Sequence, residues 1–153
     1  MEKTKEIFEK WNKEKFFIEK YKKKRKFVNI WEIWIIKIWV NIWSEISKDW
    51  CFTRPVLIIS NFLWWDLVWI IPFTTQFNSN YSKYLLELED FEKYWLNKKS
   101  YLVLNQFKII SLKRLTRLLN STKSWKQKVS KEKISEIQEN YIKIIIKKEP
   151  LNL

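Results

Sequence analysis

One arginine stands alone in the middle of the chain, directly before a proline. Arg54 is the only arginine between Arg25 and Arg114, and Pro55 fixes the backbone at the start of an apolar run. A guanidinium stays protonated in proteins, and its planar fork matches the oxygens of a phosphate. Arg54 is therefore a candidate for stabilising negative charge rather than for moving protons. The alternative is an ordinary surface charge beside a proline.

A pair of hydroxyls, Thr74 and Thr75, ends a second apolar run, where they can hydrogen-bond a ligand or simply cap a strand. Other catalytic chemistry is scarce, because the chain has no histidine to transfer protons near neutral pH. The single cysteine, Cys51, excludes an internal disulfide, argues against a zinc site and has no histidine to activate it. The acidic stretch at residues 87–92 is better explained as a solvated edge than as a metal cluster. We therefore expect no metal and no cofactor.

Positive charge is concentrated in two zones of this 153-residue chain, whose net charge is +13. Residues 1–30 carry eleven Lys/Arg against five Glu, and residues 98–131 carry ten Lys/Arg and no acid, whereas residues 31–97 are slightly acidic. Two basic zones around a nearly neutral body fit a polyanionic partner, either nucleic acid or a membrane surface. Solubility and lysine-rich codon usage explain the same pattern without a partner.

Hydrophobic periodicity predicts an amphipathic helix over residues 2–26, with Phe8, Trp11, Ile18 and Tyr21 on one face. Alternating or β-branched segments predict five strands, at residues 30–38, 55–59, 67–73, 84–88 and 101–104. Loops are expected at residues 40–53 and 74–82.

Two serines mark helices in the last third of the chain. Ser111 is expected to cap a short basic helix over residues 112–119, and Ser130 to cap a final helix. The apolar face of that final helix is formed by Ile134, Ile137, Tyr141 and Ile144. Short strands with peripheral helices predict a small barrel of the mostly-β or α+β class in a single domain.

The apolar window at residues 55–73 approaches the length of a membrane span. Asp66 and a turn interrupt it, so two buried strands of a hairpin explain it better. The first twenty residues are charged throughout and show no secretory signal. We therefore expect a cytoplasmic protein without a membrane partner.

The chain has no glycine and eleven tryptophans, although average usage includes about 7% glycine. Trp64 and Trp65 fall at the tip of the expected hairpin, where the backbone needs a positive φ angle. Six further tryptophans stand at turns or element boundaries: Trp31, Trp39, Trp43, Trp50, Trp95 and Trp125. We hypothesise that the source organism reads UGA as glycine and that these eight positions were translated as tryptophan. The alternative is a tryptophan-rich surface for ligand stacking.

Three other tryptophans, Trp11, Trp34 and Trp69, fit apolar positions of a helix or strand and are interpreted as genuine. With the other eight read as glycine, residues 30–118 resemble the MazF/PemK family of toxin endoribonucleases from toxin–antitoxin pairs. The resemblance is carried by WEIWIIKIWVNIWSE at residues 31–45, TRPVLIIS at 53–60, IIPFTTQ at 70–76 and SYLVLNQFKIISLKRL at 100–115.

The resemblance implies an SH3-like β-barrel with a C-terminal helix at residues 28–153, preceded by a basic helical extension at residues 1–27. It implies a homodimer that cleaves single-stranded RNA without a metal, leaving 2′,3′-cyclic phosphate and 5′-hydroxyl ends, and so inhibits translation and growth. A cognate antitoxin is the implied protein partner, and the toxin–antitoxin complex is implied to contact DNA.

The same resemblance assigns roles to individual residues. Arg54 is implied to be the main catalytic residue, Thr74 its partner, and Glu45 a group that orients Arg54 or accepts a proton. The residues implied to bind RNA are Ser44, Thr75, Gln76, Phe77, Asn105, Gln106 and Lys108. Asn105 stands where some members carry Asp, and Ser44 where some carry His, which places acid–base catalysis at these two positions in doubt.

Two alternatives stay open at this point. One is a catalytically inactive SH3-like module that binds nucleic acid through the basic zones. The other is a membrane-surface protein that combines tryptophan with lysine.

Overall fold

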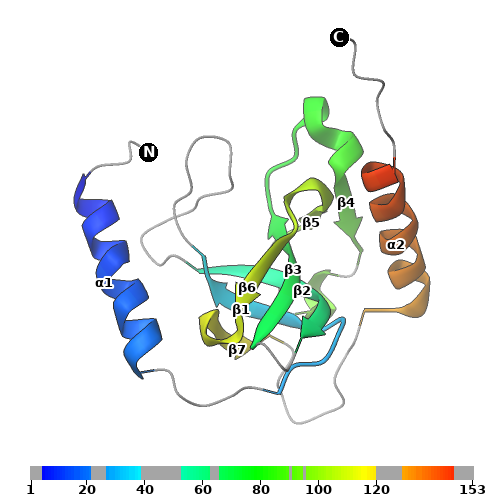
Figure 1. Cartoon of the computed structure of the whole chain (residues 1–153). Coiled ribbons are helices and arrows are strands. Elements are labelled where there is room, and N and C mark those ends of the chain that lie inside the picture. Colours follow the sequence, from blue (N-terminus) through cyan, green and yellow to red (C-terminus); the bar gives the residue numbers. More distant parts are fainter. Residues whose placement is uncertain are drawn as a thin grey trace.

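An antiparallel sheet of seven strands lies between helix α1 (Lys5–Tyr21) and helix α2 (Lys131–Ile146) (Figure 1). The computed structural model describes residues 5–21, 27–38, 53–62, 66–89, 91–94, 96–119 and 129–146. The strands are β1 (Ile33–Lys37), β2 (Thr53–Phe62), β3 (Leu67–Thr74), β4 (Leu85–Leu88), β5 (Ser100–Val103), β6 (Lys108–Ser111) and β7 (Leu115–Leu118). Their order is β4-β5-β3-β2-β1-β7, and β6 pairs with β3.

The two longest strands form the predicted hairpin. The segments predicted at residues 55–59 and 67–73 lie within β2 and β3, whose ladder runs from the pair Val56–Pro72 to the pair Phe62–Leu67. Consecutive residues of β2 are buried on both faces of the sheet, because Val56, Leu57 and Ile58 are all fully buried. A β-branched run suits a strand that has a core on each side.

Alternate residues of these strands face two separate cores. Val56, Ile58 and Ile70 face the inner core, which β1, β6 and β7 surround. Leu57 and Ile71 face the outer core, which α2 and the β4–β5 pair cover. The buried members of the inner core are Val28, Trp34, Ile36, Val56, Ile58, Val68, Ile70, Ile110, Leu112 and Leu115. Among the described ladders none joins β6 to β7, so the sheet is a curved and open form of the predicted barrel.

The predicted helix at residues 112–119 is wrong in all but its first turn. Ser111 does cap a turn, since its Oγ accepts a hydrogen bond from the Lys113 N–H at 3.2 Å. That turn is η5 (Leu112–Arg114), a 3-10 helix, and the chain then continues as β7. Leu115 is fully buried opposite Ile36 of β1, so pairing and burial override the helical propensity of this basic segment.

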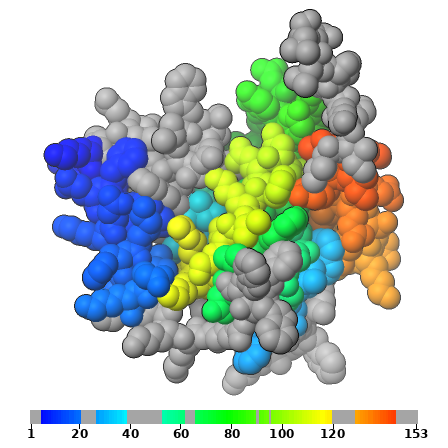
Figure 2. All heavy atoms as spheres, in the orientation of Figure 1, coloured from blue at the N-terminus to red at the C-terminus, as the bar shows by residue number. Residues whose placement is uncertain are grey.

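Helix α1 packs against β1 and the turn after β6, so its apolar face meets the sheet. Trp11 is 1% exposed, and the Arg114 guanidinium carbon lies 5.5 Å from the centre of its ring. Two ion pairs flank this contact: Glu14 binds Lys37 of β1, and Glu19 binds Lys113 at 2.6 Å. Figure 2 shows the blue α1 lying against the yellow segment that contains η5 and β7.

Helix α2 begins where the sequence predicts. Ser130 precedes its first turn, and the Ser130 Oγ accepts from the Lys133 N–H at 3.2 Å. Ile137 is 2% exposed in the outer core, and the other members of the predicted face, Ile134, Tyr141 and Ile144, pack against that core. The predicted apolar face is therefore confirmed.

The hydroxyl of Tyr141 is buried and has no hydrogen-bond partner among the residues that the structure describes. Burial also raises the pKa of this phenol. Because a buried unsatisfied hydroxyl costs about 1–3 kcal/mol, we expect Tyr141→Phe to raise the free energy of unfolding by about 1 kcal/mol. Urea denaturation measures the change. Tyr81→Phe is the control, since Tyr81 is exposed, and a destabilised Tyr141→Phe variant would contradict the expectation.

One tryptophan adopts a backbone conformation that favours glycine. Trp31, just before β1, has a φ angle of 70°, which lies in the left-handed region and is unusual for a bulky side chain. The conformation is held by backbone hydrogen bonds: the Trp31 N–H donates to the Ile58 carbonyl at 2.7 Å, and the Ile58 N–H donates to the Glu32 carbonyl at 2.9 Å. Trp31 is one of the eight positions hypothesised to be glycine, and the seven others lie outside the described residues.

Candidate active site

Arg54 is the second residue of β2. It is 7% exposed and is paired with Ile36 of β1. Because successive side chains of a strand alternate between faces, Arg54 shares a face with Val56 and Ile58, which are fully buried in the inner core. The burial separates Arg54 from an ordinary surface arginine.

Thr74 is the last residue of β3, and in the antiparallel β2–β3 pair the end of β3 lies beside the start of β2, which contains Arg54. The last pair of the β2–β3 ladder at this end is Val56–Pro72, and Arg54 and Thr74 each lie two residues beyond it. Opposite residues of an antiparallel pair have their side chains on the same face. Because side chains two apart on a strand share a face, Arg54 and Thr74 are expected on the same face of the sheet, beyond the end of this ladder.

A local turn fixes the Thr74 hydroxyl. Its Oγ1 accepts a hydrogen bond from the backbone N–H of Gln76 at 3.2 Å. Because the oxygen is used as an acceptor, the hydroxyl proton can be donated to a ligand. This is the capping contact expected of a threonine at a strand end, and it also orients Thr74 for binding.

An aromatic pair adjoins Thr74 on its other side. Tyr101 of β5 lies directly opposite Thr74 in the β3–β5 ladder, and its ring centre is 5.5 Å from that of Phe77, which is 60% exposed. The Lys99 ammonium lies 5.8 Å from the Tyr101 ring centre and binds Glu87 at 2.8 Å. Hydrogen bonding to Glu87 raises the pKa of Lys99, so this cation stays charged beside the rings.

Sequence reasoning missed Tyr101 and Lys99. The segment at residues 101–104 was recognised as a strand, but its position opposite Thr74 depends on pairing between segments far apart in the chain. The exposed Phe77 ring, packed on a Tyr101 ring that lies beside a cation, is suited to stacking on the bases of single-stranded nucleic acid.

Three residues predicted to bind RNA lie after β5. Asn105 is exposed and Gln106 partly exposed in η4 (Leu104–Gln106), a 3-10 turn packed against β3 and α2. Lys108 begins β6 opposite Ile70, and is therefore on the inner-core face. Phe107 packs against Tyr141 of α2, with ring centres 5.5 Å apart, which gives it a role in packing.

The remaining predicted residues divide into two groups. Thr75, Gln76 and Phe77 follow Thr74 directly and are all exposed. Ser44 and Glu45 lie outside the described residues. The described part of the chain contains no cluster of three His, Cys, Asp or Glu side chains that could hold a metal ion.

Solved structures show what this architecture resembles. The Mycobacterium tuberculosis toxin MazF-mt6 matches 74% of this chain and 95% of its own, with a TM-score of 0.53 and 15% sequence identity. The chain has a MazF-like fold. An endoribonuclease in complex with its cognate antitoxin, from a mycobacterial species, matches 76% of this chain and 92% of its own, with a TM-score of 0.51 and 12% identity. No family model and no curated protein matches the sequence.

The MazF-like fold confirms the predicted architecture of a small β-structure with a helix at each end. At these identities the likeness concerns the fold, so the assignment of individual side chains rests on the geometry of Arg54, Thr74 and Tyr101. None of the described helices is long and apolar enough to span a membrane.

Proposed function

We propose that this chain is the toxin of a toxin–antitoxin pair and an endoribonuclease that cleaves single-stranded RNA without a metal. The observation that carries the proposal is the burial of Arg54 in a MazF-like fold, with Arg54 and Thr74 each two residues beyond the last pair of the β2–β3 ladder. Basic zones along the sequence and the ring pair beside Thr74 support RNA as the substrate.

The reaction uses the substrate's own 2′-hydroxyl. Its oxygen forms a bond to the adjacent phosphorus while the bond from phosphorus to the 5′-oxygen breaks, which leaves a 2′,3′-cyclic phosphate and a 5′-hydroxyl. The 2′ proton leaves to a base or to water, and the 5′-oxygen gains a proton. The Arg54 fork binds the extra negative charge on the phosphorane oxygens, and the Thr74 hydroxyl donates to one of them.

Other residues assist these two. Glu45 orients Arg54 or accepts the 2′ proton, and Ser44, Asn105 and Gln106 contact the bases. A solved neighbour is an endoribonuclease in complex with its cognate antitoxin, which supports an antitoxin as the partner of this chain. We extend the proposal to a homodimer that contacts DNA when the antitoxin is bound.

The test is cleavage of a labelled single-stranded RNA in the presence of a chelator. We expect products that end in a 2′,3′-cyclic phosphate, identified by their mass and by the gain of one water when acid opens the ring to a monophosphate. A substrate with 2′-deoxyribose at the cleaved nucleotide is the matched control and is expected to stay intact, because it lacks the nucleophile. Cleavage that required Mg²⁺, or that cut the deoxy substrate, would contradict the mechanism.

A second candidate function is an inactive module that binds nucleic acid. It is favoured by Asn105, which cannot act as a general base, and by the absence of histidine. In the same assay it predicts intact RNA whose binding weakens steeply as salt is added. Both candidate functions predict that the protein binds RNA. They differ in whether cleaved RNA appears in the assay.

A further inference from the structure

A cavity of about 400 Å³ lies between α1 and the edge of the sheet. It is present because β6 pairs with β3 and β7 pairs with β1, while α1 lies across both β1 and η5. The described residues that line it are Trp11, Lys15, Ile38, Lys108, Ile109, Ile110, Ser111 and Arg114. Its volume is within the range of pockets that bind small organic ligands.

The lining of the cavity is cationic. Lys15, Lys108 and Arg114 contribute to it, and none of the described lining residues is acidic. Two α1 carboxylates bind lysines outside the lining, Glu14 to Lys37 and Glu19 to Lys113. The cavity therefore favours an anion with more than one charged oxygen.

Arg114 is the best placed of the three cations. Its guanidinium lies against the Trp11 ring, and its Nη1 donates to the Lys37 carbonyl at 3.5 Å. Burial lowers the pKa of this guanidinium, so an anion beside it would offset the lost hydration. The fork geometry suits a phosphate in particular.

The rest of the lining is mostly apolar and partly open. Among the described residues, Ser111 is its one polar member, and the apolar ones are Trp11, Ile38, Ile109 and Ile110. Ile109 is 53% exposed, so an RNA strand can enter from solvent. A phosphate group on the cations with a flat base against the isoleucines would use both parts of the lining. A nucleotide has this combination, whereas a free inorganic anion uses only the cationic part.

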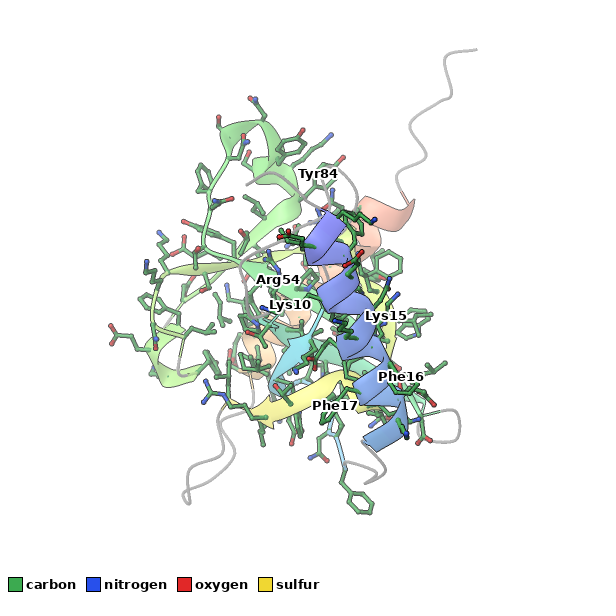
Figure 3. All side chains as sticks on the ribbon, turned by 90° about the vertical axis from the view of Figure 1, so that its left-hand side faces the viewer. Lys10, Lys15, Phe16, Phe17, Arg54 and Tyr84 are labelled. Carbon is green, nitrogen blue, oxygen red and sulfur yellow. The ribbon has the colours of Figure 1, made fainter. Side chains whose placement is uncertain are left out.

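The cavity lies near the candidate active site. Glu14 of α1 binds Lys37, and Lys37 is paired with Thr53, the residue before Arg54. Figure 3, which looks onto α1, shows Lys10 on the side of the helix toward Arg54 and Lys15 on the opposite side. An RNA strand bound at Arg54 would reach Lys15 by extending beneath α1.

We propose that this cavity holds one nucleotide of the RNA strand beyond the cleaved bond, with its phosphate bound by Lys15, Lys108 and Arg114. The inference rests on the proposed function for the identity of the ligand. It gives the N-terminal helix a part in substrate binding, so that α1 and the sheet each contribute cations to a single subsite.

The test measures binding, which does not require cleavage. The probe is a fluorescent single-stranded RNA with one 2′-deoxynucleotide at the cleaved position, and its anisotropy is followed over a salt series. Lys15→Gln and Lys108→Gln are each expected to weaken binding about tenfold, the scale of one charged hydrogen bond. Each is also expected to reduce the salt slope by about 0.7, the value for one phosphate of a single strand.

Lys13→Gln is the matched control. Lys13 is an exposed lysine of the same helix that does not line the cavity, so this variant is expected to bind like the unmodified protein. If Lys15 and Lys108 hold the same phosphate, the double variant loses less than the product of the two single losses. An RNA truncated at the cleaved bond is expected to bind all these variants equally. Melting temperatures confirm that each variant folds.

The outcomes separate the subsite from the catalytic proposal. RNA that is cleaved but bound equally by the Lys15→Gln and Lys13→Gln variants would overturn the subsite and leave the nuclease intact. If Lys15→Gln weakens RNA binding as expected but the unmodified protein never cleaves RNA, the subsite is supported and the proposed nuclease activity is rejected. An acidic peptide that is sensitive to Lys15→Gln, with RNA insensitive, would assign the cavity to a protein partner and overturn the inference.

Discussion

RNA cleavage by the Arg54→Ala variant is expected to fall by about 10²–10³-fold, the loss that follows removal of one preorganised charge-stabilising group. Arg54 is buried and lies two residues beyond the last pair of the β2–β3 ladder, as Thr74 does on the other strand. Single-turnover rates in chelator, with RNA at saturating concentration, measure the chemical step directly.

Two further substitutions make this result specific. Arg54→Lys keeps the charge but loses the fork, and we expect it to recover only a small part of the rate. Arg117→Ala removes an exposed arginine of β7 and is expected to cleave normally. A normal rate in Arg54→Ala, with an unchanged circular dichroism spectrum, would exclude Arg54 from catalysis.

The second large effect concerns tryptophan. Trp34 is 7% exposed in the inner core, and its Nε1 donates to the buried Glu32 at 3.0 Å. We expect Trp34→Gly to lower the free energy of unfolding by about 3–5 kcal/mol or more, since it opens a cavity and also places glycine within a strand. Urea denaturation measures this loss.

At position 31 we expect glycine to be favoured over alanine, because of the backbone conformation. The Trp31 φ angle of 70° is one that glycine adopts freely. Trp31→Gly and Trp31→Ala both remove the ring, so the difference between them isolates the backbone. We expect the glycine variant to be about 1 kcal/mol more stable than the alanine variant, whereas at position 34 the alanine variant is expected to be the more stable of the two.

A Trp31→Ala variant as stable as Trp31→Gly would count against glycine as the natural residue there. The parent gene offers an independent measurement. The hypothesis expects UGA codons at position 31 and at the other seven turn positions, and UGG at positions 11, 34 and 69. The burial of Trp11 and Trp34 agrees with the interpretation that these two are genuine.

Long periodic patterns made part of the fold predictable. The β2–β3 hairpin follows from two apolar runs around a turn, and the buried face of α2 from residues three or four apart. In α1 the same spacing predicted the burial of Trp11 and Ile18. In each case the prediction needs only the residues of one segment, because the spacing of its own apolar side chains decides which face is buried.

The rest depends on contacts between distant segments. The basic residues after Ser111 favour a helix locally, yet Leu115 enters the inner core beside Ile36 and the segment becomes β7. The pairing of Thr74 with Tyr101 likewise follows from how β5 meets β3. Arg54, Thr74 and Phe77 could be named in advance as candidates, but Tyr101, which lies opposite Thr74 and packs on Phe77, could not.

Strand β3 pairs with three other strands along its length. Residues 67–70 have β2 on one side and β6 on the other, and residues 73 and 74 pair with β5. The amides in its middle are thus expected to exchange with solvent only when the whole molecule unfolds. Thr74 lies at the end of this slowly exchanging segment, where the strand leaves β2 for β5. The candidate site is thereby attached to the most persistent part of the fold, while its ligand-binding side remains at the edge.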